Sequence, residues 1–121
     1  MNKRLILLVF TLILLACKKN QLGGTSTIEG KVVHHSKEIP GARVFIKFNT
    51  ADFPGNDTTK YDEKVIADSN GNYSIKCFKG EYYLYGVGND YAISPPLVVG
   101  GLSVKIRKNE SVKANIAVTE D

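Results

Sequence analysis

The sequence predicts an all-β domain built as a two-sheet sandwich of about seven strands. From residue 28 onward, apolar residues alternate with polar ones in short stretches, which is the pattern of strands that bury one face. Glycine, asparagine and proline separate these stretches, and no stretch of helical length repeats apolar residues every three or four positions. Together these observations favour a β-sandwich.

The first two predicted strands follow this alternation closely. Residues 28–32 place Ile28, Gly30 and Val32 on one face. The turn at residues 39–41 then reverses the chain, because its proline fixes φ and its glycine permits a tight bend. The apolar face of the second strand consists of Ala42, Val44, Ile46 and Phe48.

Five further strands complete the predicted sandwich. A strand near residues 63–68 leads into an Asn-Gly pair at residues 69–72, which predicts a tight hairpin turn before a strand at 72–78. The remaining strands are predicted near residues 82–85, 102–106 and 112–118. The segment 88–101 contains two adjacent prolines and two adjacent glycines, so we expect a broken edge there whose strand order the sequence leaves open.

The first seventeen residues combine positive charge, a short apolar run and a cysteine. Lys3 and Arg4 precede residues 5–16, which are apolar apart from one threonine, and Cys17 follows directly. This arrangement resembles a bacterial lipoprotein signal peptide, and the run is shorter than the roughly twenty residues that a spanning helix needs. We expect removal of residues 1–16 and lipidation of Cys17, so that acyl chains (palmitate among them) hold the mature chain on a membrane. The alternatives are an ordinary secretory signal with an incidental cysteine and a short buried helix.

Residues 17–26 are polar and contain glycine, so we expect a flexible lipidated tether. Lys18 follows the cysteine, where the sorting signals that this one resembles carry aspartate to retain a lipoprotein in the inner membrane. We therefore expect the lipidated protein in the outer membrane. Lys18 and Lys19 also differ from the acidic residues that direct some lipoproteins to the outer face, which favours the periplasmic side of the cell envelope.

The chain that remains after cleavage, residues 17–121, is long enough for one domain, which we expect at residues 27–121. Removing sixteen of the 121 residues leaves 105 and lowers the formal charge from +4 to +2. The lysines that remain are spread along the chain, so nucleic acid is not an expected partner. Cys77 has no intramolecular partner if Cys17 is acylated. Its place in the alternation predicts an inert buried thiol, with a nucleophile as the alternative.

Four short motifs follow each other in the order of a known family. Ile28-x-Gly30-x-Val32, residues 39–44 (Ile-Pro-Gly-Ala-x-Val), residues 68–75 (Asp-x-Asn-Gly-x-Tyr-x-Ile) and residues 80–84 (Gly-x-Tyr-x-Leu) resemble the carboxypeptidase regulatory-like domain. The resemblance spans residues 27–118. It implies a seven-stranded, prealbumin-like Greek-key sandwich that serves as a non-catalytic accessory module. These motifs specify turns and core positions rather than chemistry.

Neither histidines nor carboxylates predict a metal site. His34 and His35 are adjacent, and adjacent strand residues point to opposite faces, so we expect them to diverge and to be partly exposed. Residues 68–72 begin like a calcium loop, but Lys79 stands where the bidentate glutamate belongs. A turn is expected there, with a calcium site completed by distant carboxylates as the alternative. We expect no catalytic residue, metal or cofactor.

Aromatic residues supply the candidate contact surface. The long loop at residues 49–62 contains Phe53 and Tyr61, which either contact a partner or pack back over the end of the sandwich. Further aromatic residues point away from the predicted core or extend that surface: Phe45, Tyr83, Tyr85 and Tyr91. The alternative is that a loop such as residues 92–101 covers them. Thr58 lies in an Asp-Thr-Thr motif that some bacteria glycosylate.

These features predict a non-enzymatic, lipid-anchored module of the cell envelope that binds a protein or glycan partner. One alternative is an enzyme on a prealbumin-like fold, such as a hydrolase, and another is a purely structural spacer. A ring-cleaving iron enzyme would need two histidines and two tyrosines around one ion, which the expected divergence of His34 and His35 disfavours.

Overall fold

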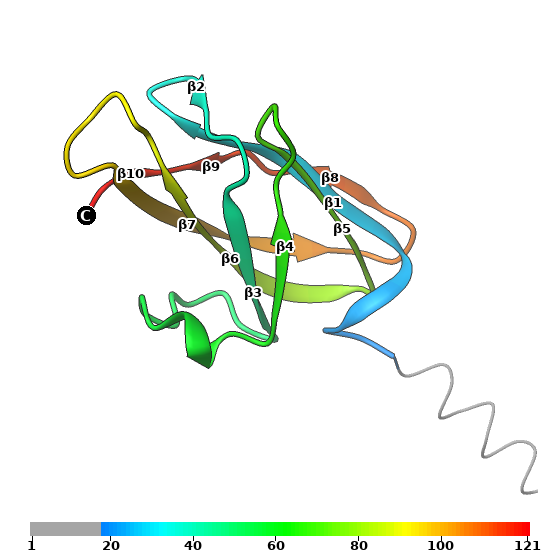
Figure 1. The fold of residues 1–121 in the computed structure, drawn as a ribbon. Coiled ribbons are helices and arrows are strands. Elements are labelled where there is room, and N and C mark those ends of the chain that lie inside the picture. Colours follow the sequence, from blue (N-terminus) through cyan, green and yellow to red (C-terminus); the bar gives the residue numbers. More distant parts are fainter. Residues whose placement is uncertain (1–17) are drawn as a thin grey trace, which may run out of the picture.

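The computed structural model describes residues 18–121, so the predicted signal peptide and Cys17 lie outside the described residues. The described chain forms two packed β-sheets, with one short 3-10 helix at Thr58–Lys60 (Figure 1). In chain order the strands are β1 (Leu22–His34), β2 (Lys37–Glu38), β3 (Arg43–Phe48), β4 (Glu63–Ile66), β5 (Asn72–Cys77), β6 (Gly80–Asn89), β7 (Leu97–Ile106), β8 (Ser111–Lys113), β9 (Ile116–Ala117) and β10 (Thr119–Glu120). The predicted all-β sandwich is confirmed. Within residues 18–121, no helix is long and apolar enough to cross a membrane.

The described residues form ten strands rather than about seven. Three strands, β2, β9 and β10, are two residues long and carry too little alternation to be predicted. The strand predicted at residues 112–118 is divided into β8 and β9. The other six predicted strands correspond to β1 and to β3 through β7.

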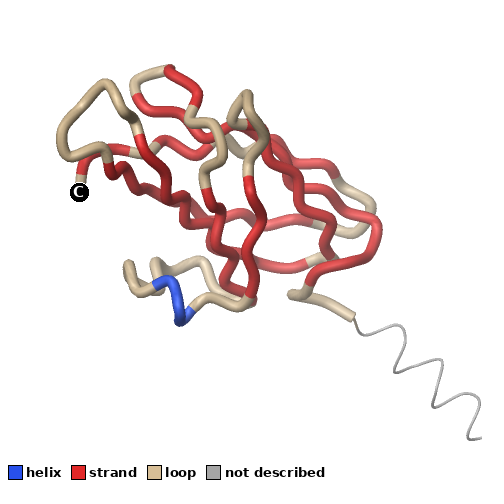
Figure 2. Tube along the Cα trace, viewed as in Figure 1, coloured by secondary structure: helices blue, strands red, loops and turns tan. Residues whose placement is uncertain are grey.

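The chain passes repeatedly between the two sheets. In one sheet, β1 pairs with β2 and β5 antiparallel and with β8 and β9 parallel. The other sheet has the order β10-β7-β6-β3-β4 (Figure 2). Strands β1 and β5 are neighbours although β3 and β4 of the opposite sheet lie between them in sequence. Such crossing connections are those of a Greek-key sandwich.

The core lies between the sheets and follows the predicted alternation. On β1, Ile28 and Val32 are fully buried, and Gly30 between them is required by a close approach of two backbones. A Cβ atom at Gly30 would lie 2.1 Å from the carbonyl oxygen of Ala114. The largest fully buried side chains of the other elements are Ile39, Val44, Ile46, Tyr82, Leu84, Val98 and Ile116.

The turn at residues 68–72 is not the predicted hairpin, because β4 and β5 lie in different sheets. Asp68 Oδ1 accepts hydrogen bonds from the backbone N–H groups of Asn70 (2.8 Å) and Asn72 (2.9 Å). Gly71 adopts φ +76°, which glycine tolerates best. The carboxylate therefore stabilises a bend that carries the chain across the sandwich.

The expected broken edge at residues 88–101 is also absent. Strands β6 and β7 pair over ten consecutive residues, from Gly80 opposite Ile106 to Asn89 opposite Leu97. Gly100 and Gly101 lie inside this ladder, and β10 covers the other side of β7. The prolines fall in the loop between the strands, where no ladder hydrogen bond is lost.

The prediction of a flexible tether at residues 17–26 is wrong from residue 20 onward, because these residues are bonded to the domain. Asn20 N–H donates to the carbonyl of Lys79 (2.9 Å), and Asn20 Oδ1 accepts from the N–H of Glu81 (2.9 Å). Gln21 accepts from Phe78 N–H (2.9 Å), and β1 begins at Leu22. Main-chain hydrogen bonds hold this segment, so its polar composition gave no sign of the strand.

Candidate functional site

The predicted aromatic residues gather on the outer face of the β3–β6 pair. Tyr61 stacks on Tyr85 with ring centroids 5.7 Å apart and planes at 17°, and lies 6.0 Å from the ring of Phe45. Phe53 packs on the rings of Tyr83 (5.6 Å) and Tyr85 (5.5 Å). We call these five residues the aromatic cluster. Tyr91 does not belong to it, because its side chain lies in the loop after β6 and is 84% exposed.

The loop at residues 49–62 builds this cluster, and its own polar groups fix its shape. Asp62 accepts from Phe48 N–H (2.7 Å) at the base, and Asp57 accepts from Thr59 N–H (3.1 Å) to cap the 3-10 helix. The Tyr61 hydroxyl donates to the carbonyl of Gly55 (2.9 Å). Such a loop presents its side chains in one arrangement.

The structure shows what covers the aromatic residues of the strands and where the aromatic residues of the loop pack. Tyr85 is buried beneath Tyr61 and Phe53, so the loop at residues 49–62 covers the strand aromatics and residues 92–101 do not. Phe53 and Tyr61 pack on the sheet face rather than over the end of the sandwich, yet Phe53 remains 54% exposed. Burial raises the pKa of Tyr61, Tyr83 and Tyr85, so their phenols stay neutral at physiological pH. Thr58 lies half-buried in the 3-10 helix.

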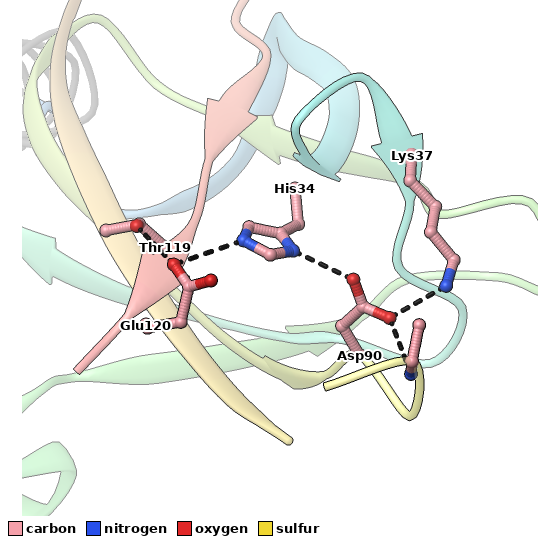
Figure 3. Close-up of polar contacts among 6 residues, drawn as sticks. His34, Lys37, Asp90, Thr119 and Glu120 are labelled. Atoms are coloured by element: carbon pink, nitrogen blue, oxygen red, sulfur yellow. Dashed lines mark hydrogen bonds and ion pairs between the residues drawn. The ribbon is translucent and has the colours of Figure 1, made fainter. Parts of the chain in front are cut away.

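A second cluster, absent from the sequence-based prediction, surrounds His34 at the far end of β1 (Figure 3). His34 Nδ1 lies 2.8 Å from Asp90 Oδ2, and the other Asp90 oxygen accepts from Lys37 Nζ (2.7 Å) and from Ala92 N–H (3.0 Å). His34 Nε2 lies 3.3 Å from Glu120 Oε2 on β10. His34 and Asp90 are buried, at 3% and 5% exposure.

The expected divergence of His34 and His35 is wrong, and so is the expected exposure of His34, which is buried, whereas His35 is exposed. β1 ends at His34, and the next two residues adopt left-handed backbone angles, with φ +49° at His35 and +68° at Ser36. The alternation of a strand therefore does not extend to His35, and the two imidazole centroids lie 4.3 Å apart. One ligand atom each of His34, His35 and Glu120 lies within 4.8 Å of the others.

The charges around His34 reinforce one another. The hydrogen bond to Asp90 raises the pKa of His34, with Glu120 contributing in the same direction and burial opposing both. Lys37 first, and then His34 and the Ala92 N–H, hold the pKa of Asp90 far below its usual value. The pKa of Glu120 is lowered chiefly by its own backbone N–H, then by the Thr119 hydroxyl and His34. Asp90 is thus an anion that orients the imidazole ring.

The sequence offered little signal for this cluster. Its members come from β1, β2, the loop after β6 and β10, and only the fold brings these segments together. Asp90 could have been suspected as a turn residue, because it directly follows a long strand and its side chain caps the loop through Ala92. Glu120 stands next to the last residue of the chain and fits no motif.

Two other residues singled out by the sequence have structural surroundings. Cys77 is fully buried in the core, and burial raises the pKa of its thiol. Such a thiol is a poor nucleophile at physiological pH. Asp68 directs its carboxylate at the N–H groups of its own turn, which leaves it little capacity for calcium.

Solved structures of several chains are similar to this protein. A crystal structure of a DUF3823 family protein from Parabacteroides merdae superimposes with a TM-score of 0.49 at 16% sequence identity. The superposition covers 78% of this chain, which spans 45% of the length of that protein. No family model matches the sequence, and a search of curated proteins finds no relative.

Proposed function

We propose that this protein is a non-enzymatic, lipid-anchored accessory module of the bacterial cell envelope, held with one defined end against a membrane. The observation that carries the proposal is the attachment of Asn20 to the turn between β5 and β6. Only Lys18 and Lys19 separate this fixed residue from Cys17. Three residues span at most about 11 Å, so a lipid on Cys17 would hold the domain directly at the bilayer surface.

The surface around Asn20 is suited to that position. A shallow depression of about 430 Å³ is lined by Lys19, Lys79, Lys105, Arg107 and Lys108, with Glu81 as its one acidic residue. Basic side chains near an anionic membrane contribute about 1 kcal/mol each to binding. Charge and lipid would therefore act together to orient the domain. We propose the outer membrane, because Lys18 stands where inner-membrane retention signals carry aspartate, and its periplasmic side, because Lys18 and Lys19 differ from the acidic residues that direct some lipoproteins to the outer face.

The aromatic cluster supplies a contact surface for a protein or glycan partner. Its loop is fixed by internal hydrogen bonds, and Phe53 is 54% exposed above Tyr83 and Tyr85. A rigid, half-exposed aromatic side chain loses little conformational entropy on binding, which is typical of interface anchors. The loop begins at Asn49, whose side chain accepts from Asn20 Nδ2 (3.3 Å), so it starts at the proposed membrane-facing end.

We also propose that the domain belongs to the carboxypeptidase regulatory-like family. The turn glycines Gly41 (φ +67°) and Gly71 (φ +76°), and the close approach at Gly30, match the roles that the carboxypeptidase regulatory-like motifs require. An accessory module needs no catalytic group. A hydrolase would need an accessible nucleophile or base, whereas Cys77 is buried and Asp90 already engages His34.

Two experiments test the proposal. Metabolic labelling with palmitate, followed by membrane fractionation, should place the label in the outer-membrane fraction, and Cys17→Ser should abolish it. An unlabelled wild-type protein would refute lipid anchoring. A photo-crosslinking residue at position 53 in cells should then give one discrete adduct, whereas the same residue at position 91, which lies outside the aromatic cluster, should give none. Equal or absent crosslinking at both positions would instead favour a structural spacer.

A further inference from the structure

One ring nitrogen of His34, Nε2, has no hydrogen-bond partner within the described residues and faces only the carboxylate of Glu120. Asp90 Oδ2 can only accept, so Nδ1 of His34 (2.8 Å away) carries the proton in that hydrogen bond. In the neutral ring, Nε2 then has a lone pair and no proton. Nε2 is buried and has no hydrogen-bond partner among residues 18–121. Its nearest polar neighbour is Glu120 Oε2, at 3.3 Å, which is also an acceptor.

Two acceptors that face each other at this distance need a positive charge between them. Either a proton on Nε2 or a metal cation can supply it. The surroundings favour a cation, because a third donor stands beside the pair. One ligand atom each of His34, His35 and Glu120 lies within 4.8 Å of the others. His35 and Glu120 are exposed, so a cation can reach the three groups from solvent.

We propose that His34, His35 and Glu120 form a binding site for a divalent transition-type cation such as Zn²⁺. Two imidazoles and one carboxylate are a common zinc ligand set, and they supply too few oxygens for Ca²⁺ or Mg²⁺. The proposal is independent of the membrane function proposed above.

The distances fit this cation. In tetrahedral zinc sites the ligand atoms lie roughly 3.3 Å apart, because each metal–ligand bond is about 2.0 Å long. The separation of His34 Nε2 and Glu120 Oε2 has this value, at 3.3 Å. The ligand atom of His35 lies within 4.8 Å of the other two, and its side chain stands in an exposed turn, where rotation about its side-chain dihedrals can bring it closer. Three protein ligands leave a fourth position for water or another donor.

Asp90 would act as the outer-shell partner of the site. A metal-binding histidine usually donates its other N–H to a carboxylate, which fixes the tautomer and the orientation of the ring. Asp90 has this position, and Lys37 Nζ and Ala92 N–H hold its second oxygen in place. His34 therefore presents the lone pair of Nε2 toward Glu120 before any cation binds. The bound ion would connect β10, near the end of the chain, to the end of β1.

The test is calorimetric titration of the full chain, purified in detergent and stripped with a chelator, with ZnCl₂. We expect one site with a dissociation constant in the micromolar range or below. His35→Ala and Glu120→Gln should each weaken binding at least tenfold, because each removes one of three ligands. These two exposed residues are chosen because changes at buried His34 could also disturb folding. Glu63→Gln, an exposed carboxylate on β4, is the matched control and should leave the affinity unchanged.

Nitrogen-15 NMR of the imidazoles separates a cation from a proton. Zinc should shift the Nε2 resonance of His34 while Nδ1 keeps its proton, and the Tm of the wild type should rise with zinc whereas that of Glu120→Gln should not. The proposal fails if wild-type protein binds no Zn²⁺, Co²⁺ or Ni²⁺. It also fails if both ligand variants bind zinc like the wild type, or if Nε2 keeps a proton that zinc does not displace.

Discussion

Buried polar side chains at the two ends of β1 differ in their hydrogen-bond partners. At the end where β1 begins, side chains bond to main-chain carbonyls: Ser26 Oγ donates to Arg107 O (2.6 Å), and the Tyr82 hydroxyl lies 2.7 Å from Phe78 O and 3.1 Å from Gln21 O. At the end where β1 stops, His34 bonds to the Asp90 side chain, and Asp90 also accepts from Lys37 Nζ and from Ala92 N–H. Among residues 18–121, Nε2 of His34 has no hydrogen-bond partner and faces the Glu120 carboxylate. Figure 1 shows β10 and the C-terminus at the end of the sandwich away from the start of β1.

This difference indicates that the polar groups at the start of β1 serve stability and that those at its end serve ligand binding. Polar groups that contribute to stability are satisfied by the protein itself, since an unsatisfied buried group costs free energy. A buried nitrogen left without a partner, in a ring otherwise fixed by Asp90, is the kind of exception that functional sites contain. We therefore expect changes at the start of β1 to alter folding and position, and changes at its end to alter ligand binding.

The largest effect is expected from Tyr82→Ala. Tyr82 is fully buried, and its ring meets Phe48 edge to face at 5.9 Å. Truncation leaves a cavity and removes the hydroxyl that bonds Phe78 O and Gln21 O, so the free energy of unfolding should fall by about 3–5 kcal/mol in urea denaturation. Tyr82→Phe, which keeps the ring, should lose only about 1 kcal/mol. Equal losses for both variants would mean that hydrogen bonding, rather than packing, dominates this end.

The basic surface at the same end should control membrane affinity. Reversing Lys105, Arg107 and Lys108 to Glu should weaken binding of residues 18–121 to anionic vesicles by at least about 100-fold, because loss of the three positive charges alone removes about 1 kcal/mol each. Sedimentation at low salt measures this, and the difference should shrink as salt is raised. Reversal of Arg43, Lys60 and Lys64, exposed cations outside this depression, is the control for net charge. If both triple variants lose affinity equally, no specific end faces the membrane.

The same comparison explains how far the sequence could be interpreted. The six longer strands were predictable because alternation with period two identifies a strand that buries one face, as at Ile28 and Val32 on β1 or Val44 and Ile46 on β3. The two-residue strands and the polar start of β1 were not, since main-chain hydrogen bonds hold them irrespective of side-chain type.

Among the candidate residues, the aromatic cluster was predictable in composition but not in arrangement. Alternation indicated that Phe45, Tyr83 and Tyr85 point away from the core, whereas only the fold shows which loop covers them. The His34 cluster was out of reach for two reasons. The alternation of a strand ends at His34, one residue before His35, and the sequence does not mark this end. The partners Asp90 and Glu120 are more than 50 residues away from His34 in sequence.

A smaller effect is expected from Asn20, which fixes the N-terminal segment. Asn20→Ala removes the hydrogen bond to Glu81 N–H and places alanine at φ +52°, so the free energy of unfolding should fall by about 1–2 kcal/mol. Hydrogen exchange at the Glu81 amide should accelerate. Asn20→Gly removes the same bond without backbone strain, so it should cost less. Unchanged exchange at Glu81 in both variants would mean that Asn20 does not hold the segment.

The smallest effect, and the one whose sign is most informative, is expected from Glu120→Gln in the metal-free protein. Above the pKa of His34 the ring is neutral, and its Nε2 lone pair faces the Glu120 carboxylate at 3.3 Å. The glutamine amide can donate to that nitrogen, so with chelator, at a pH where NMR shows the His34 ring neutral, the Tm should stay level or rise by up to about 3 °C. The same substitution should abolish the gain in Tm from zinc. A residue whose replacement leaves stability intact and removes binding is retained for its ligand. A fall in Tm at that pH would instead make Glu120 a structural partner of His34, and the polar groups at both ends of β1 would then serve stability.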